Sequence, residues 1–265
     1  MRSYIYELVR SKFLWCSVIG LYLCLITSTA GTLSDGSTIT VVEYIFSDRT
    51  AFSGFNIGLE YVLFSFNSQI LSVIYPLVAG FATVALFCDK RAYKYSLFVN
   101  IRKGSAVIAL YELSTSFIAM VICSVLAYIG YAITIISVFP IKHLEISQLF
   151  ISAILLSIVM LVGNLLSLIC ATIVSNKYFA LFVPMFLLYL LRGITDSIVI
   201  SVISSEGIGE KAYVLELLNP FNYLNLYSSG IPVILKFVIP GAVILIISVI
   251  SFACLYISGR RCITR

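Results

Sequence analysis

The longest apolar run in the chain covers residues 105–139 and reads SAVIALYELSTSFIAMVICSVLAYIGYAITIISVF. Glu112 is its one charged residue. A bilayer hydrocarbon core about 30 Å thick is crossed by about 20 apolar residues in a helix, and this run is longer than that. We therefore expect the segment to tilt in the membrane or to break near Gly130.

Five further apolar runs, each bounded by charged residues, lie at 13–31, 61–88, 149–174, 179–199 and 234–257. A backbone in hydrocarbon must satisfy its own N–H and C=O groups, and the alternating polar pattern of a membrane barrel is absent. The predicted fold class is therefore all-α. The prediction is a polytopic membrane protein with six transmembrane helices in a single domain over residues 1–265.

The composition supports this class. Of 265 residues, 61% are apolar and 11% are charged, whereas about 25% of the residues in an ordinary soluble domain are charged. A soluble globule is excluded, and no polar stretch is long enough to form a separate catalytic domain in water. The seven cysteines lie in apolar runs or beside basic clusters, so we expect small core residues rather than disulfides. They are Cys16, Cys24, Cys88, Cys123, Cys170, Cys254 and Cys262.

The first twelve residues, MRSYIYELVRSK, form an amphipathic pattern. Tyr4, Ile5 and Leu8 fall near one helical face, together with Trp15, while the basic residues lie on other faces. This pattern predicts an N-terminal helix lying in the membrane interface. Two alternatives remain open: an ordinary basic flank with a single tryptophan anchor, or a secretory signal peptide.

The charges are distributed unequally between the loops. With the N-terminus in the cytoplasm, twelve of the 17 Lys and Arg residues fall in inner segments, and eight of the 12 Asp and Glu residues fall in outer segments. This asymmetry predicts a multi-pass protein of the cell membrane with both termini cytoplasmic. We expect the basic surplus to face the anionic inner leaflet of the lipid bilayer rather than nucleic acid.

The inner segment 89–104 reads DKRAYKYSLFVNIRKG and has basic clusters at both ends. A simple cytoplasmic connector does not need the apolar and aromatic residues that lie between these clusters. A short helix here would offer an apolar ridge to the groove of a soluble partner. The alternative is that these residues are the ends of the two adjoining helices.

Three outer segments, 32–60, 140–148 and 200–233, complete the expected topology. The first contains turn signals with apolar residues between them and is expected to fold on the membrane surface. The third has apolar pieces that are too short to cross a bilayer, which predicts an outer re-entrant helical hairpin between spans five and six. A plain extracellular loop is the alternative.

Few ionisable residues lie within the predicted spans, where such groups are candidates for function. Glu112 is a possible gate, near enough to the inner surface to reach Arg102 or Lys103, or else an interfacial acid. We expect Arg192 and Asp196, four residues apart, to form a local ion pair, and Lys236 opens the last span.

The sequence offers little for catalysis or cofactor binding. The single histidine, His143, lies in a short outer loop, and Gly207 and Gly209 are only a fragment of a phosphate-loop pattern. No cysteine pair has the spacing of zinc ligands. We therefore expect a transport subunit that is not an enzyme and binds no metal or cofactor itself.

Three stretches together resemble the small six-span permease subunits of ABC-type exporters, the type 2 permease class. They are MRSYIYELVRSKFLW, DKRAYKYSLFVNIRKGSAVIALYEL and LLNPFNYLNLY. The resemblance covers nearly the whole chain, in the expected topology and in the general pattern of apolar and basic residues. It implies an N-terminal elbow helix, a coupling helix within 89–104 that docks on a separate ABC ATPase subunit, and two short outer helices before the last span. It also implies a second permease chain, in a homodimer or a heterodimer.

The function that this resemblance implies is ATP-driven export of a hydrophobic or amphipathic cargo, such as a peptide, a bacteriocin or a drug-like molecule. ATP and Mg²⁺ would bind to the partner ATPase. The residues expected to bind this partner are Arg91, Tyr95, Leu97, Phe98, Ile101, Arg102 and Lys103, the apolar ones filling its groove and the cations orienting the helix. The alternative is a self-contained secondary transporter or channel, although no group of acids lies at mid-depth in the spans to form a relay.

Overall fold

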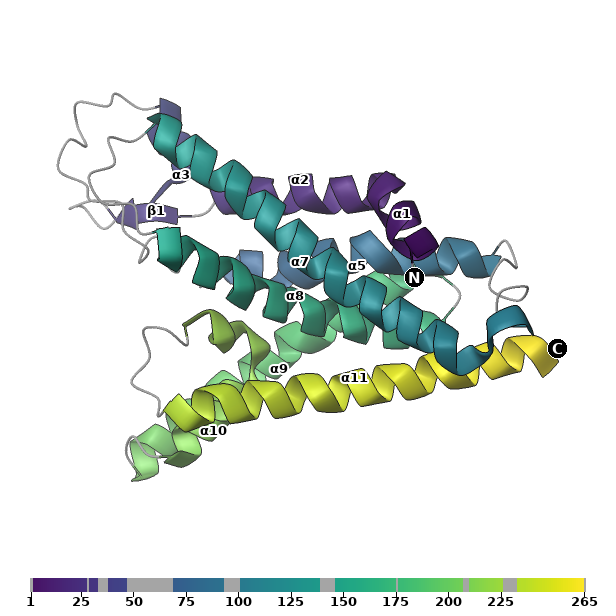
Figure 1. Cartoon of the computed structure of the whole chain (residues 1–265). Coiled ribbons are helices and arrows are strands. Elements are labelled where there is room, and N and C mark those ends of the chain that lie inside the picture. Colours follow the sequence, from purple (N-terminus) through teal and green to yellow (C-terminus); the bar gives the residue numbers. More distant parts are fainter. Residues whose placement is uncertain are drawn as a thin grey trace.

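The computed structural model describes residues 2–27, 29–32, 38–46, 69–92, 101–138, 146–174, 176–206, 210–225 and 233–264. Within these residues the fold is helical, apart from one two-stranded ribbon (Figure 1). The elements in chain order are α1 (Arg2–Arg10), α2 (Lys12–Ile26), β1 (Thr29–Thr32), β2 (Thr38–Thr40), α3 (Val41–Phe46), α5 (Gln69–Ala92), α7 (Ser105–Val138), α8 (Ile146–Ile173), α9 (Lys177–Glu206), α10 (Glu210–Leu218), the 3₁₀ helix η2 (Pro220–Asn225) and α11 (Val233–Thr264).

Each of the six predicted apolar runs contains a helix, but several boundaries differ from the prediction. The first run was expected to continue to residue 31, whereas α2 ends at Ile26. The reason is that Thr29–Thr32 pairs antiparallel with Thr38–Thr40. In the second run, α5 is described from Gln69 and continues past residue 88 to Ala92, while residues 61–68 lie outside the described part of the chain.

The third run does not break near Gly130, because α7 is continuous from Ser105 to Val138. Gly130 lies against the ring of Tyr22, where an added Cβ would be 3.2 Å from Cδ2. The fifth run was predicted to end at residue 199, but α9 continues to Glu206. The outer segment that follows contains α10 and η2, two short helices.

The outer segment 32–60 is described only in part. Its described portion includes β2 and α3, and Thr40 begins α3 with a capping box. The backbone N–H of Thr40 donates to Oε2 of Glu43 at 2.9 Å, and the Glu43 N–H donates to Oγ1 of Thr40 at 3.2 Å. These hydrogen bonds from Thr40 lower the pKa of the exposed Glu43 carboxyl.

Four helical segments are long and apolar enough to cross a membrane, namely Ser105–Thr134, Ala153–Ile173, Lys177–Ser204 and Ile234–Arg261. A fifth is added if α1 and α2, bent by 57° at Ser11, count as one broken span. These segments come from the described residues alone, which for the second run begin at Gln69. The apolar helices indicate a protein embedded in a membrane, and the six-span topology stays a prediction.

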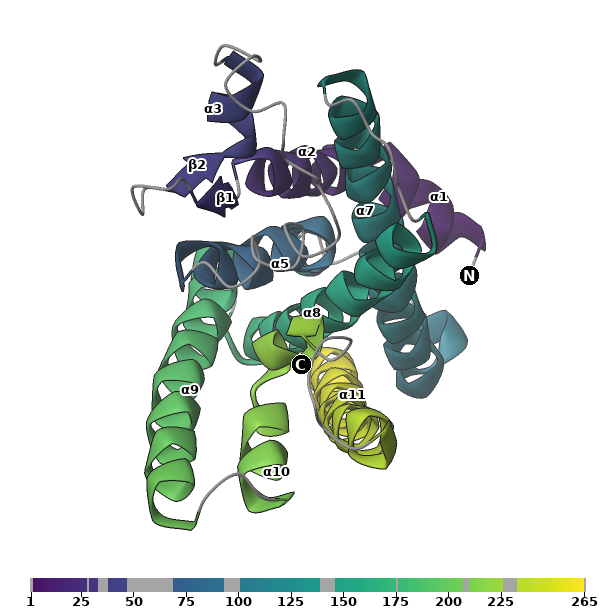
Figure 2. The ribbon, with the colours of Figure 1, turned by 90° about the vertical axis from the view of Figure 1, so that its left-hand side faces the viewer.

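The core of the bundle is built around α8, which packs against α5, α7, α9 and α11 (Figures 1 and 2). In the most apolar part of α8, 67% of the residues are buried inside the protein. The corresponding share is 11% in α9 and 17% in α11, which lie at the periphery. The apolar side chains of these two peripheral helices therefore face away from the core of the bundle.

Polar contacts join the helices in this core. The Thr83 hydroxyl of α5 donates to Oδ1 of Asn164 in α8 at 2.6 Å, and Ser17 in α2 donates to the carbonyl of Val78 at 2.9 Å. Gly80 allows α5 to approach its neighbours closely, because a Cβ there would be 2.5 Å from Cδ2 of Leu181. Small residues and interhelical hydrogen bonds of this kind are what hold membrane helices together.

The bend between α1 and α2 has its own hydrogen bonds. Ser11 is the N-cap residue of α2, and its hydroxyl accepts a hydrogen bond from the N–H of Phe13 at 3.2 Å. The indole Nε1 of Trp15 donates across the bend to the carbonyl of Val9 at 3.0 Å. In α1, Tyr4 and Leu8 are buried and Tyr6 is exposed. The helix expected over the first twelve residues is therefore present and has a buried and an exposed face.

Candidate functional site at the charged end of the bundle

Several helix ends meet on the side of the molecule where Figure 1 marks both chain termini. Nη1 of Arg91, at the end of α5, donates to the carbonyls of Ala171 and Thr172 at 3.0 and 3.1 Å. Nζ of Lys177, at the start of α9, lies 3.3 Å from Oδ1 of Asp89. The cation of Arg91 thus satisfies the last carbonyls of α8, and the end of α5 is fixed to both α8 and α9.

A second group of contacts joins the end of α5 to α1 and α7. We call it the Lys90 cluster, made of Tyr4, Glu7, Lys90 and Glu112. Nζ of Lys90 lies 3.1 Å from Oε2 of Glu7 in α1 and 3.9 Å from Oε1 of Glu112 in α7. The same ammonium lies over the ring of Tyr4, 4.1 Å from its centroid. One lysine therefore contacts side chains of two other helices.

The charges of the Lys90 cluster do not balance, since one ammonium faces two carboxylates. The side chains of Lys90 and Glu112 are 12% and 9% exposed, and that of Glu7 is 37% exposed. Lys90 contacts the carboxylates as ion pairs, without the alignment of a hydrogen bond. A buried charge is costly unless it is paired, so Lys90 is the group on which both carboxylates depend.

A second lysine reaches the same region from the start of α7. Nζ of Lys103 lies 5.2 Å from the ring centroid of Tyr111, and this ring is 5.5 Å from that of Tyr4. Between Lys103 and α7, Gly104 has a φ of +81°, a conformation that favours glycine. Lys90 and Lys103, which flank residues 93–100 in the sequence, therefore contact the two members of one tyrosine pair.

The residues expected to bind a partner lie partly at this end. Ile101 is 64% exposed, and Arg102 and Lys103 are exposed beside it. Arg91 contacts α8 instead of projecting freely. The expected partner-binding residues outside the described part of the chain are Tyr95, Leu97 and Phe98.

Glu112 is buried, and its ionic contact differs from the expected one. The sequence suggested contact with Arg102, Lys103 or a water at lipid depth, whereas the ion pair of its carboxylate among the described residues is with Lys90 of α5. This pairing joins α5 to α7, and spacing along a single helix does not indicate such a contact. The possible role of Glu112 as a gate stays a proposal.

Sequence reasoning also missed Tyr4, Glu7, Lys90 and Tyr111 as members of a site. One signal was available: Glu7 is the single acid in the basic segment 1–12, and it lies about one helical turn after Tyr4. An isolated acid at the edge of the buried face of an amphipathic helix indicates a cation on the neighbouring element.

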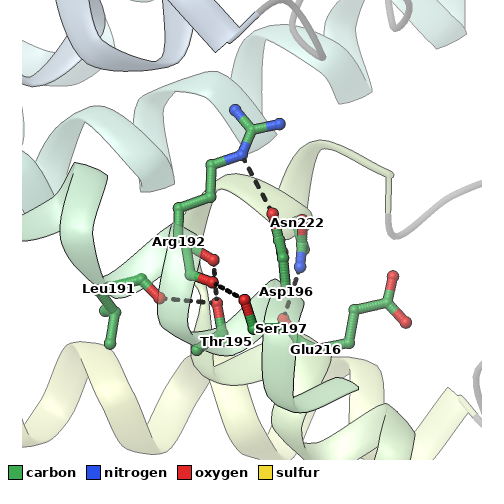
Figure 3. Close-up of polar contacts among 8 residues, drawn as sticks. Leu191, Arg192, Thr195, Asp196, Ser197, Glu216 and Asn222 are labelled. Carbon is green, nitrogen blue, oxygen red and sulfur yellow. Dashed lines mark hydrogen bonds and ion pairs between the residues drawn. The ribbon is translucent and has the colours of Figure 1, made fainter. Parts of the chain in front are cut away.

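Toward the opposite end, α9 carries the expected ion pair of Arg192 and Asp196 (Figure 3). Nε of Arg192 lies 3.6 Å from Oδ2 of Asp196, which confirms that prediction. In α10 and η2, Nδ2 of Asn222 donates to the backbone carbonyl of Glu216 at 2.8 Å. Burial, and secondly the negative charge of Asp196, raise the pKa of the Glu216 carboxyl.

Among the described residues, no group of three or more His, Cys, Asp or Glu side chains could hold a metal ion. His143 lies outside these residues. Six cysteines have described side chains and are free, and of these Cys24, Cys88 and Cys123 are buried as expected for core residues, while Cys170 and Cys254 are half-buried. Cys16 is exposed, so the core prediction is wrong for it.

Comparisons with known protein families and with curated proteins found no match for this chain. A functional conclusion therefore depends on the arrangement of the charged end.

Proposed function

We propose that the chain is the permease subunit of an ATP-driven ABC exporter in the cell membrane, with both termini at the cytoplasmic face. One observation carries the proposal. The end of α5, which precedes residues 93–100, is fixed to the bundle by charged contacts, and Ile101, Arg102 and Lys103, which follow these residues, are exposed. A rigid base with an apolar and cationic edge suits a docked soluble partner.

In the proposed topology, six spans are formed by α2, α5, α7, α8, α9 and α11. Helix α1 lies in the inner interface, and α10 and η2 form the outer re-entrant hairpin. Support comes from the charges: Arg260 and Arg261 end α11 on the side of the Lys90 cluster (Figure 1), whereas Glu216 lies in α10, toward the other end. Cations on the cytoplasmic side agree with the general bias of membrane proteins.

The proposed mechanism uses a separate ABC ATPase subunit that docks on residues 89–104. ATP and Mg²⁺ close two such ATPase subunits, and the docked segments move. Paired permease chains, identical or different, then shift their spans and expel the cargo. The cargo class is hydrophobic or amphipathic, such as a peptide, a bacteriocin or a drug-like molecule, and Glu112 would act at the cytoplasmic gate.

The test uses the full chain in lipid nanodiscs together with an ABC ATPase taken from a neighbouring reading frame of the same genome. Phe98→Asp and Ile101→Asp place a charge on the proposed ridge and are expected to abolish co-purification of the ATPase. Val214→Asp is the matched control, because Val214 is an exposed apolar residue of α10, away from the ridge. If both ridge variants retain the ATPase and its transport activity, the docking assignment is wrong.

The alternative, a self-contained secondary transporter or channel, makes a different prediction for reconstituted vesicles. The chain alone would then move a hydrophobic dye or peptide without nucleotide, and at an undiminished rate in Phe98→Asp. Under the exporter proposal, movement requires both the ATPase and hydrolysable ATP.

A further inference from the structure

We propose that Lys90 and Lys103 clamp α1 onto the bundle, so that a displacement of the segment between them is passed to α1 as well as to α7. We call Tyr4, Glu7, Lys90, Lys103, Tyr111 and Glu112 together the lysine clamp. The transmission of movement rests on the proposed function, because it assumes that a partner moves residues 89–104. The clamp itself does not depend on that function.

The contacts form a continuous chain from one lysine to the other. Lys90 lies 4.1 Å from the ring centroid of Tyr4, the rings of Tyr4 and Tyr111 are 5.5 Å apart, and Lys103 lies 5.2 Å from the ring centroid of Tyr111. Cation–π contacts of this kind strengthen when they are shielded from water. Tyr4 belongs to α1 and Tyr111 to α7, so the tyrosine pair that joins these two helices lies between the two lysines that flank residues 93–100.

Helix α1 is short and is separated from the next helix by a bend. It has 9 residues, and an isolated helix of that length is marginal in water. A bend of 57° at Ser11 separates it from α2, and its buried apolar side chains are Tyr4 and Leu8. The ion pair of Glu7 with Lys90 therefore adds a charged contact to the buried side chains and the Trp15 hydrogen bond that hold α1.

Lys90 also couples the positions of α1 and α7, because it forms an ion pair with an acid of each helix. Its ammonium is 3.1 Å from Glu7 and 3.9 Å from Glu112, which belong to these two helices. Moving Lys90 away weakens both contacts together, because no second cation is recorded within 4 Å of either carboxylate among the described residues. A shift at the end of α5 thus loosens α1 and leaves the carboxylate of Glu112 in α7 unpaired in one step.

The clamp is tested by hydrogen exchange in the full chain in lipid nanodiscs, read from peptides that cover α1. Lys90→Gln and Glu7→Gln are expected to accelerate exchange of the α1 amides about tenfold, since local opening sets that rate. The double variant is expected to show the same acceleration as Lys90→Gln alone, because Lys90→Gln already removes the ion pair that Glu7→Gln removes. Lys90→Arg keeps the cation and is expected to retain the protection of the wild type.

Lys177→Gln is the matched control. It removes another lysine of the same end, paired with Asp89 at 3.3 Å and without recorded contact to α1. Wild-type exchange in Glu7→Gln and Lys90→Gln would overturn the clamp, as would equal acceleration in Lys177→Gln. Glu7 lies at the surface of the bundle, so its substitution leaves the fold testable even where Lys90→Gln does not fold.

A second measurement separates the clamp from the proposed function. With the ATPase subunit present, Glu7→Gln, which lies outside the docking segment, is expected to keep the bound ATPase and lose ATP-driven transport. If α1 is released but ATP-driven transport continues unchanged, the transmission of movement is wrong and the clamp stands. If the wild type shows no ATPase-dependent transport at all, the proposed function fails, while the exchange result still decides the clamp.

Discussion

Removing Lys90 and removing the charge of Glu112 should have very different effects on stability, although the two side chains form one ion pair. The perturbations are Lys90→Met and Glu112→Gln, which keep side-chain size while deleting one charge each. The difference arises because Lys90 faces two carboxylates, whereas Glu112 shares its cation with Glu7.

The distances give the magnitude. At an effective dielectric constant of about 20, Lys90 attracts Glu7 by about 5 kcal/mol and Glu112 by about 4 kcal/mol. The two carboxylate oxygens are no more than about 7 Å apart and repel each other by at least about 2 kcal/mol.

The net effects follow after allowance for desolvation. Lys90→Met leaves two uncompensated carboxylates, one of them buried, so we expect a loss of about 3 kcal/mol in the free energy of unfolding. Glu112→Gln loses one attraction but also relieves the repulsion and the burial of a charge. We expect its free energy of unfolding to stay within about 1 kcal/mol of the wild type.

The assay is denaturant unfolding of the purified chain in mixed micelles, followed by far-ultraviolet circular dichroism. Lys177→Met serves as the control. Its pair with Asp89 is about one-third exposed on both sides, so we expect a loss of no more than about 1 kcal/mol. Equal losses in Lys90→Met and Glu112→Gln would refute the shared-cation reasoning, and so would a loss in Lys177→Met as large as that in Lys90→Met.

Three further substitutions test the packing and the outer acid. Gly80→Ala places a Cβ 2.5 Å from Cδ2 of the buried Leu181, so we expect a loss of about 1–3 kcal/mol in the same unfolding assay. Thr83→Val removes the 2.6 Å hydrogen bond to Asn164 at constant shape, and we expect a loss of about 1 kcal/mol; no loss would show that this bond does not join α5 to α8. The pKa of Glu216 is raised in the folded chain, so its ionised form opposes folding once the pH exceeds the ordinary carboxyl pKa of about 4. Glu216→Gln should therefore raise the unfolding midpoint more at pH 7 than at pH 4, and an equal change at both values would contradict the assigned burial.

The helices could be predicted because a long apolar run in this composition has few alternatives. Their ends were harder, since they depend on pairing and caps. The first run ends early because threonines near residues 30 and 40 prefer a ribbon, which the apolar pattern does not indicate. The helix of the fifth run continues to Glu206 because no Gly or Pro lies between residue 199 and Gly207. Gly130 is tolerated within α7, where it faces the ring of Tyr22.

The candidate site could be predicted only in part. The basic residues on both sides of 93–100 could be predicted as a site because they interrupt the apolar pattern. Glu112 could be predicted because it is the one charged residue in the apolar run 105–139. The ion pair of Arg192 and Asp196 was predictable because both lie on one helix at a fixed spacing. The contact of Glu112 with Lys90 joins two helices, and spacing along the chain carries no information on such a pairing.

The single tryptophan of the chain gives the bend at Ser11 an optical signal of its own. Its indole donates a hydrogen bond from α2 back to the carbonyl of Val9 in α1, and the ring of Trp15 is about half exposed. Straightening or release of α1 breaks that bond and changes the polarity around the indole. Fluorescence excited at the red edge of the absorption band, where the tyrosines do not absorb, therefore follows α1 in the unlabelled protein, in real time and in any lipid.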